Sequence, residues 1–466
     1  MIGQVNRIDV LPDDVLLEIF DFYVDTHSLN PLVKTQAERW QLLVHVCRRW
    51  RNLVFGSPRR LHLRLCCTAD TPVRDTLDVW PALPLIVNGA VASPQSPGTD
   101  NTVAALWQSN RVCQVNLRLA GRQSEKLLAP MQTSFPELTD LRLFSKDDET
   151  PPVIPDSFLG GSAPPRLQTF RLSGISFPGL PKLLLSATRL VSLELIRIPH
   201  SGYISPETIV ALISVLSSLK TLEIGFRSPQ SRPNQSLTPP KRSILPALEI
   251  FYFEGVAEYL EELLTRIDTP QLYDVGITFF DQMDFDCPRL AQFVNRTPKL
   301  RAPNIAYIEF DEGDASVNLR YRTSPLHDLR INVPCHITPD RSLSYMERVC
   351  KNSFLHPLLS LEDLHILNLN SELFWDDDAV DNTLWLQLLR PFTAVINLYL
   401  CDETAPGVAA ALQELVEGGI TEVVLPNLQN IFVAKLKPWG LFQETIGQFA
   451  TVRRRSGRPI SISIWK

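Results

Sequence analysis

The residues that could perform catalysis are scattered along this chain of 466 residues, and none forms the pattern of an active site. The sequence has no G-x-x-x-x-G-K-[ST] or G-x-G-x-x-G phosphate loop, no H-E-x-x-H zinc motif and no G-x-S-x-G nucleophile turn. Eight histidines are dispersed, none beside a cysteine or histidine at metal-ligand spacing. An enzyme would need acids, histidines or cysteines clustered in a pocket. We therefore expect a protein that is not an enzyme, with no cofactor and no metal.

Three further groups of reactive residues also have ordinary explanations. The eight cysteines include no C-x-x-C pair, so we expect buried thiols in a reducing compartment and no disulfides. The acidic run at 376–378 lacks the glycine and glutamate of a calcium loop and indicates a helix start or a solvated turn. The basic run Arg453–Arg455 with Arg458 fits a nuclear signal, although a solvated helix end is the commoner explanation.

Length and composition set the class of protein. The chain exceeds one ordinary core, so we expect several domains or one long solenoid. Hydrophobic residues at 44% and charged residues at 21% are ordinary globular values. A net charge of -6 gives no attraction to nucleic acid or to a membrane surface. With no apolar run near the roughly 18 residues of a membrane span and no signal-peptide pattern, we expect a cytoplasmic and/or nuclear protein.

Two amphipathic helices are predicted within the first sixty residues. Pro12 suits the first turn of the first helix, and apolar residues then recur at helical spacing from Leu16 to Tyr23. A second apolar stripe runs from Trp40 to Val54, and Pro58 ends it. About fifty residues can hardly bury this much apolar surface alone, so the excess needs the rest of the chain or a partner. A plain helical hairpin that packs on the following residues is the alternative.

These helices resemble an F-box, the adaptor-binding module of cullin–RING ubiquitin ligases. F-box modules show Leu-Pro, then an apolar helix that ends in Ile-Phe, then a helix that reads close to Val-Cys-Arg-x-Trp. The matching positions here are Leu11, Pro12, Leu16, Leu17, Ile19, Phe20, Val46, Cys47, Arg48, Trp50 and Leu53. The resemblance covers residues 7–60, and the link from Asp25 to Arg39 is longer than is usual in the family.

The resemblance implies that this module binds a Skp-type adaptor, which joins the chain to a cullin. In the family, the faces of these helices dock into an apolar groove of the adaptor. The residues that the resemblance assigns to adaptor binding are Leu11, Pro12, Leu16, Leu17, Ile19, Phe20, Val46, Cys47, Trp50 and Leu53. A large side chain such as Trp50 belongs either to that interface or to the core of the module, and the sequence leaves both open.

From Val112 onward the sequence repeats the pattern apolar-x-x-apolar-x-apolar. Its twelve copies begin at Val112, Leu138, Leu167, Leu190, Leu219, Leu248, Leu272, Ile305, Leu326, Leu361, Val395 and Leu428. The second and third apolar anchors fall on one side of a short strand. Helical stretches are predicted between copies, at 205–216, 256–267 and 408–416. Short strands are also predicted at 61–65, 83–87 and 460–465.

A strand-then-helix unit with a mean step of about 29 residues resembles a leucine-rich-repeat solenoid, in which neighbouring units stack. That family usually has Asn or Cys three residues after the third anchor, and no copy here does. The steps are also uneven, from roughly 21 to 35 residues. We therefore expect a divergent, irregular solenoid, with an alternating α/β layer fold as the alternative.

In such a solenoid the residue between the second and third anchors faces the concave surface. We expect these residues to bind a protein client, because arginine and tyrosine are enriched among interface anchors. The candidates are Arg142, Arg171, Glu223, Tyr252, Arg330, His365 and Tyr399, with Glu194, Glu309 and Phe432 at equivalent positions. An ordinary polar sheet face is the alternative.

The sequence thus predicts an α/β chain with short N-terminal all-α F-box helices at 7–60, a connecting segment with short strands at 61–111, and an irregular leucine-rich-repeat-like strand–helix solenoid at 112–466. By resemblance, the chain would be the non-catalytic substrate-recognition subunit of a Skp–cullin–F-box (SCF) E3 ubiquitin ligase. Its partners would be the Skp-type adaptor, the cullin and an unknown protein client, with no nucleic acid and no membrane. The alternative is a solenoid protein-interaction scaffold without ubiquitin-ligase association.

Overall fold

The structure is a computed structural model in which the chain divides into two units, Met1–Leu190 and Val191–Lys466. The residues that it describes are 11–25, 39–68, 73–89, 98–120, 123–146, 150–229, 242–280, 287–301, 303–311, 314–321, 324–334, 339–351, 361–369, 382–417, 424–434 and 439–465. The acidic run at 376–378 lies outside them, as do parts of the segment 7–60.

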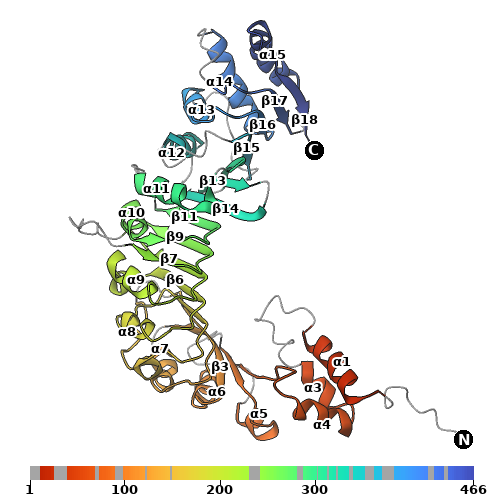
Figure 1. The fold of residues 1–466 in the computed structure, drawn as a ribbon, viewed down its shortest axis with the longest axis vertical. Helices are drawn as coiled ribbons and strands as arrows, with labels where there is room; N and C mark the ends of the chain where they lie inside the picture. The colour runs from red at the N-terminus through yellow and green to blue at the C-terminus, as the bar shows by residue number, and fades with distance from the viewer. Residues whose placement is uncertain are drawn as a thin grey trace, which may run out of the picture. The chain divides into compact units, whose positions relative to one another are not determined.

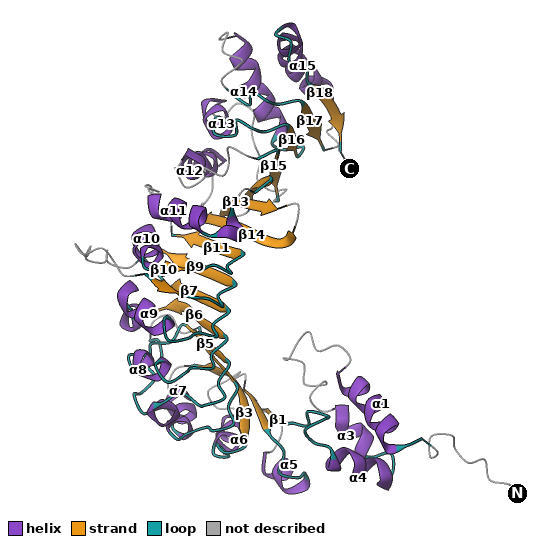
Figure 2. Cartoon of the chain, in the orientation of Figure 1, coloured by secondary structure: helices purple, strands orange, loops and turns teal. Residues whose placement is uncertain are grey.

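Both units are mixed α/β structures built on mostly parallel strands (Figures 1 and 2). Among the described residues the strands form no closed barrel. Within the same ranges, we find no helix with the length and apolar character needed to cross a membrane.

The first unit begins with helices and continues with alternating strands and helices. Its elements are α1 (Asp13–Asp25), α3 (Arg39–Val44), α4 (Arg48–Gly56), β1 (Leu65–Thr68), α5 (Val73–Val79), β2 (Leu85–Gly89), α6 (Gly98–Leu106), β3 (Val112–Leu119), α7 (Gln123–Leu128), η2 (Pro130–Gln132), β4 (Asp140–Ser145), η3 (Phe158–Gly161), β5 (Thr169–Ser173) and α8 (Leu180–Leu184). Strands β1 to β5 pair in parallel in chain order.

The second unit continues the alternation. Its elements are β6 (Ser192–Ile198), η4 (His200–Gly202), α9 (Pro206–Ile213), β7 (Thr221–Phe226), β8 (Ser243–Ile244), β9 (Ile250–Gly255), α10 (Ala257–Thr265), β10 (Ile267–Asp268), β11 (Asp274–Phe279), α11 (Pro288–Arg296), η5 (Pro298–Leu300), β12 (Ile305–Phe310), β13 (Asp314–Tyr321), β14 (Ser324–Pro334), α12 (Pro339–Lys351), β15 (Asp363–Asn368), α13 (Asn382–Leu389), β16 (Asn397–Leu400), α14 (Ala405–Glu417), β17 (Asn430–Val433), α15 (Trp439–Arg455) and β18 (Ser461–Ile464). The order in its sheet is β6-β7-β9-β11-β14-β13-β12-β15-β16-β17-β18, and β8 pairs with β10 separately.

Each copy of the six-residue pattern coincides with a strand, which confirms this prediction. The second and third anchors of every copy are buried, and parallel registers align most of them, as with Leu141 beside Phe170. In the second unit, helices α9 to α13 lie along one side of the strands (Figure 1). The apolar core therefore runs between the anchor face of each sheet and its helices.

Most of the predicted helices and short strands are also present. Helices α9, α10 and α14 occupy the predicted stretches. The Ser205 hydroxyl accepts a hydrogen bond from Thr208 N (3.3 Å) and caps α9, whose first residue is Pro206. Strand β18 confirms the last predicted strand, whereas β1 and β2 begin a few residues later than predicted.

One region departs from the regular alternation. Strand β13 runs antiparallel to both β12 and β14 and separates them, so β14 pairs with β11 and β12 pairs with β15. The anchors predicted for β12 were also displaced by two residues, because Ala306, not Ile308, pairs with Leu364. Tyr307 therefore lies beside His365 in place of Glu309, which shares the sheet face of Tyr307 but is two residues further along β12.

Candidate functional site: a helical surface and a sheet face

The first candidate surface belongs to the N-terminal helices, whose core is made of large apolar side chains. Leu16, Leu17 and Phe20 of α1 are buried. Trp50 of α4 packs against Phe20, with ring centroids 4.6 Å apart. Trp40 of α3 is buried, and its Nε1 donates a hydrogen bond to Arg64 O (3.0 Å). These contacts make the three helices one packed module.

Polar contacts fix the ends of these helices. Arg49 Nη2 donates to Leu11 O (2.6 Å) and to Asp13 Oδ1 (2.5 Å), which ties α4 to the first turn of α1. This ion pair is partly exposed, so it is worth at most about 1 kcal/mol. Cys47 caps α4, because its Sγ accepts a hydrogen bond from Trp50 N (3.5 Å).

The same module exposes an unusual amount of apolar surface. Val15, Ile19, Phe22 and Tyr23 recur at i, i+4, i+7 and i+8, so they form a second stripe on α1 that is exposed. Phe22 is the most exposed of them at 73%. Leu42 and Val46 are exposed in the same way, Leu42 at 62%. Contiguous exposed apolar surface of this kind marks interaction sites.

The residues that the F-box resemblance assigns to adaptor binding divide by burial. Leu16, Leu17 and Phe20 lie in the core of the module; Pro12, Ile19, Val46 and Cys47 are exposed; and Leu11, Trp50 and Leu53 are half-buried. The motif did not single out Val15, Phe22 or Leu42. The apolar residues on the far side of α1 were the signal that would have identified Val15 and Phe22.

The second candidate surface is the sheet face opposite the anchors. In the second unit the pairing registers join side chains of successive strands into one row, which runs through Glu194, Glu223, Tyr252, Gly276, Arg330, Asn318, Tyr307, His365, Tyr399, Phe432 and Ser463. The candidates predicted in this unit, Glu309 excepted, therefore lie in one row. Asn318 and Tyr307 were not predicted, and Asn318 is fully buried within the row.

In the first unit, Arg142 and Arg171 lie side by side on β4 and β5. Arg142 Nη2 donates to Asp140 Oδ2 (3.0 Å), two residues away on the same strand. The Arg171 guanidinium lies over the Phe144 ring, 5.3 Å from its centroid. This face therefore carries two adjacent guanidinium groups, one of them ion-paired with the Asp140 carboxylate.

At the C-terminal end the row becomes a stack of rings. Tyr307 and His365 lie 4.5 Å apart, His365 and Tyr399 4.1 Å apart, and Tyr399 and Phe432 4.6 Å apart, in nearly parallel planes. Trp465 meets the edges of His365 and Tyr399, at 6.3 and 5.9 Å. Each such pair is worth about 0.5–1.5 kcal/mol beyond its buried area, so the stack is a rigid surface.

Polar groups accompany this stack. Asn430 Nδ2 donates to Asn397 Oδ1 (2.8 Å), and Asn397 Nδ2 donates to Asp363 Oδ1 (2.7 Å), which forms a chain of hydrogen bonds two residues before the rings. The Arg320 guanidinium lies 4.7 Å from the Tyr307 centroid and covers one end of the stack. Burial, aided by Arg320 and opposed by Asp363, lowers the pKa of His365 to about 4, so its ring is neutral at pH 7.

Tyr252 is held in place by a glycine on the next strand. A Cβ atom on Gly276 would lie 2.5 Å from Tyr252 Cδ1, so the ring lies directly over this glycine. The Tyr252 hydroxyl donates to Asp274 Oδ2 (2.7 Å). Burial, followed by this hydrogen bond, raises the pKa of Tyr252 well above its usual range, so it remains a hydroxyl donor at physiological pH.

Comparisons with protein-family models and with curated proteins found no match to this chain. Among the described residues, no group of three or more histidine, cysteine, aspartate or glutamate side chains could hold a metal ion. The two candidate surfaces thus consist of an apolar helical patch and a sheet face of aromatic, amide and charged side chains.

Proposed function

We propose that this chain is a non-catalytic substrate-recognition subunit of a Skp–cullin–F-box (SCF) E3 ubiquitin ligase. The observation that supports it most is the exposed apolar stripe on α1, centred on Ile19 and Phe22, within helices whose sequence resembles an F-box. A helix that exposes such a stripe to solvent suits docking into an apolar groove. The adaptor would contact this stripe together with Leu42 and Val46, while Leu16 and Phe20 would hold the module together.

The strands and helices that follow would form an irregular leucine-rich-repeat-like solenoid that presents the client. The sequential parallel strands with helices on the anchor side support this proposal. The row from Glu194 to Phe432 offers a rigid mixture of charged and aromatic groups, as protein-binding surfaces do. The E2 and RING subunits would transfer ubiquitin, and this chain would contribute by holding the client near them.

Co-purification of the full chain with a Skp-type adaptor and a cullin tests the proposal. We expect the native chain to bring down both proteins, and an Ile19→Asp, Phe22→Asp variant to lose them because the charges cannot enter an apolar groove. Both residues are exposed, so the variant should remain folded. The matched control is Val153→Asp, Leu185→Asp, which places two charges on exposed apolar positions outside the helical module.

If the control variant retains the adaptor and the Ile19→Asp, Phe22→Asp variant loses it, the result supports the receptor function. A well-folded native chain that brings down neither protein would overturn it. The chain would then be a protein-interaction scaffold without ubiquitin-ligase association.

A further inference from the structure

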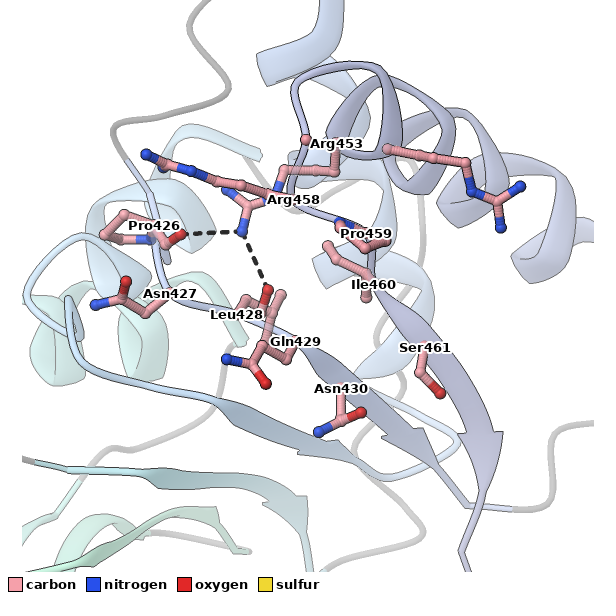
Figure 3. A pocket seen from close by; sticks show the side chains of 12 residues that line it. Pro426, Asn427, Leu428, Gln429, Asn430, Arg453, Arg458, Pro459, Ile460 and Ser461 are labelled. Carbon is pink, nitrogen blue, oxygen red and sulfur yellow. Dashed lines mark hydrogen bonds between the residues drawn. The ribbon is translucent and has the colours of Figure 1, made fainter.

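A basic cavity of about 740 Å³ lies beside the last strand of the second unit (Figure 3). Its walls are the C-terminal end of α15 and the starts of β17 and β18. The cationic side chains of its lining are Arg453, Arg454 and Arg458, and the neutral polar side chains are Asn427, Gln429, Asn430 and Ser461. It therefore combines several hydrogen-bond donors with positive charge.

The arginines of this cavity are not needed to cap the helix. Gly457, at φ +76°, ends α15 in a left-handed conformation. Its N–H donates to Arg454 O (3.1 Å), and the Arg458 N–H donates to Arg453 O (2.9 Å). This is the Schellman arrangement, which satisfies the last carbonyl groups through the backbone. The side chains of Arg454 and Arg458 therefore have no capping duty.

The three guanidinium groups differ in role. Arg453 is buried, and its Nη2 donates to Pro426 O (3.0 Å) and Leu428 O (3.1 Å), which fixes the loop before β17 (Figure 3). Arg454 and Arg458 are exposed. Within the part of the chain that the structure describes, neither of them has a carboxylate at ion-pair distance, so both are available to an anion.

The cavity adjoins an open sheet edge. Strand β18 pairs with β17 on one side, and no described strand pairs with its other side. Ser461 N and Trp465 N donate to β17, at Gln429 O and Val433 O, so the backbone groups of Ile462 and Ile464 point outward. The strand contains no proline or charge to block pairing, and Ile464 is 55% exposed.

We propose that this edge and cavity bind an extended, carboxylate-rich segment of a partner protein. The segment would add a strand to β18, and its Asp or Glu side chains would enter the cavity and pair with Arg454 and Arg458. Backbone hydrogen bonds to Ile462 and Ile464 give affinity for any extended polypeptide, and the cavity selects the acidic ones. An apolar residue of the added strand would also cover Ile464. That this segment belongs to the client rests on the proposed function.

The charges of the site decide the occupant. A second copy of the chain paired edge to edge through β18 would run antiparallel and place its Ile464 and Trp465 near these arginines, and neither residue carries a carboxylate side chain. A nucleic acid cannot supply the strand that the edge needs. Carboxylates are the anions that an unmodified polypeptide carries, and guanidinium groups pair with them in a two-pronged geometry.

The test uses fluorescence anisotropy with the full chain and labelled peptides, without adaptor. The probe is Glu-Glu-Val-Thr-Val-Thr-Val-Glu-Glu. Three comparison peptides differ from the probe: the first has glutamine in place of the glutamates, the second has phosphoserine in place of the glutamates, and the third has proline in place of the central valine. The test variant is Arg454→Glu, Arg458→Glu, and the matched control is Arg390→Glu, Arg455→Glu, which changes net charge equally at exposed arginines outside the cavity.

We expect the test variant, the glutamine peptide and the proline peptide each to weaken binding about tenfold or more, and the control variant to weaken it less than about twofold. If charge reversal unfolds the chain, Arg454→Gln, Arg458→Gln gives the same comparison. Equal weakening by both variants would overturn the proposal, as would tighter binding of the phosphoserine peptide. A dimer in sedimentation that excludes the peptide would also overturn it, in favour of a second copy. Adaptor binding without peptide binding refutes this site alone, whereas peptide binding without adaptor binding refutes only the proposed ligase function.

Discussion

Replacing Phe22 by alanine should weaken adaptor binding and leave the fold intact. Phe22 is 73% exposed, and a phenylalanine presents about 200 Å², so about 150 Å² is available to a partner. At about 25 cal/mol per Å², full burial of that area is worth about 3–4 kcal/mol. Ordering of the side chain and incomplete coverage reduce this to about 2–3 kcal/mol. We therefore expect the dissociation constant to rise about 30- to 150-fold.

Phe20, two residues earlier on the same helix, is the matched comparison. Its ring is fully buried and lies 4.6 Å from the Trp50 ring. Phe20→Ala should leave a cavity and destabilise the helical module by about 3–5 kcal/mol. Phe22→Ala should change stability by no more than about 0.5 kcal/mol.

Isothermal titration calorimetry with a Skp-type adaptor and thermal unfolding of each variant separate the two effects. Phe22→Ala should lower the affinity for the adaptor and leave the unfolding temperature unchanged. Phe20→Ala should lower the unfolding temperature. If Phe22→Ala binds the adaptor as tightly as the native chain, the exposed stripe is not the contact surface and the assignment fails.

Three further predictions concern the sheet. The pKa of His365 is about 4 in the folded chain and about 6.5 in the unfolded chain, so the unfolded chain binds more protons between these pH values. The free energy of unfolding should therefore fall as the pH drops from about 6.5 to about 4, by roughly 1–2 kcal/mol after allowance for the partial exposure of the ring. Urea titrations of His365→Phe should lack this loss, and an equal loss in the variant would refute the prediction. Gly276→Ala should cost about 1–2 kcal/mol in the same titrations by displacing the Tyr252 ring, and an unchanged midpoint would show that the ring moves freely. Asn318 is fully buried and its amide has no hydrogen-bond partner among the described residues, so Asn318→Leu should raise stability by about 1–2 kcal/mol; a loss of stability would mean that the amide is satisfied.

The strands could be predicted because the apolar anchors of the six-residue pattern are the residues that become buried. Apolar residues two apart mark the buried side of a strand, and the third anchor precedes a turn, so Leu141 and Leu143 could be placed in β4 from sequence alone. Helix α9 was predictable for the same kind of reason, since Ser205 and Pro206 are local signals for a helix start.

The departures arise where pairing depends on distant residues. Strand β13 alternates polar and apolar residues, which is typical of a strand, but it fits no copy of the six-residue pattern. Nothing in its own residues specifies its antiparallel pairing between β12 and β14. Ala306 is small, so the pattern took Ile308 as the second anchor in its place, and Tyr307 was lost from the aromatic row. Register is a property of two strands, and one strand read alone leaves it open.

In the helical module, too, the sequence alone did not decide which apolar residues are exposed. Periodicity identified an apolar α1, but not which of its two apolar stripes faces the core. Packing of Trp50 on Phe20 decides this and leaves Ile19 and Phe22 outside. Motif positions therefore include both core and surface residues, and only the structure separates them.

Amide hydrogen exchange of the full chain, with and without a saturating Skp-type adaptor, tests the central claim most directly. Exchange reports local opening, so a docked partner slows it where the partner binds. We expect slower exchange in α1 and α3, within residues 13–25 and 39–46, and unchanged exchange in strands β15 to β18. Unchanged exchange in both helices, or slowing confined to the strands, would contradict the claim that these helices are the adaptor-binding surface.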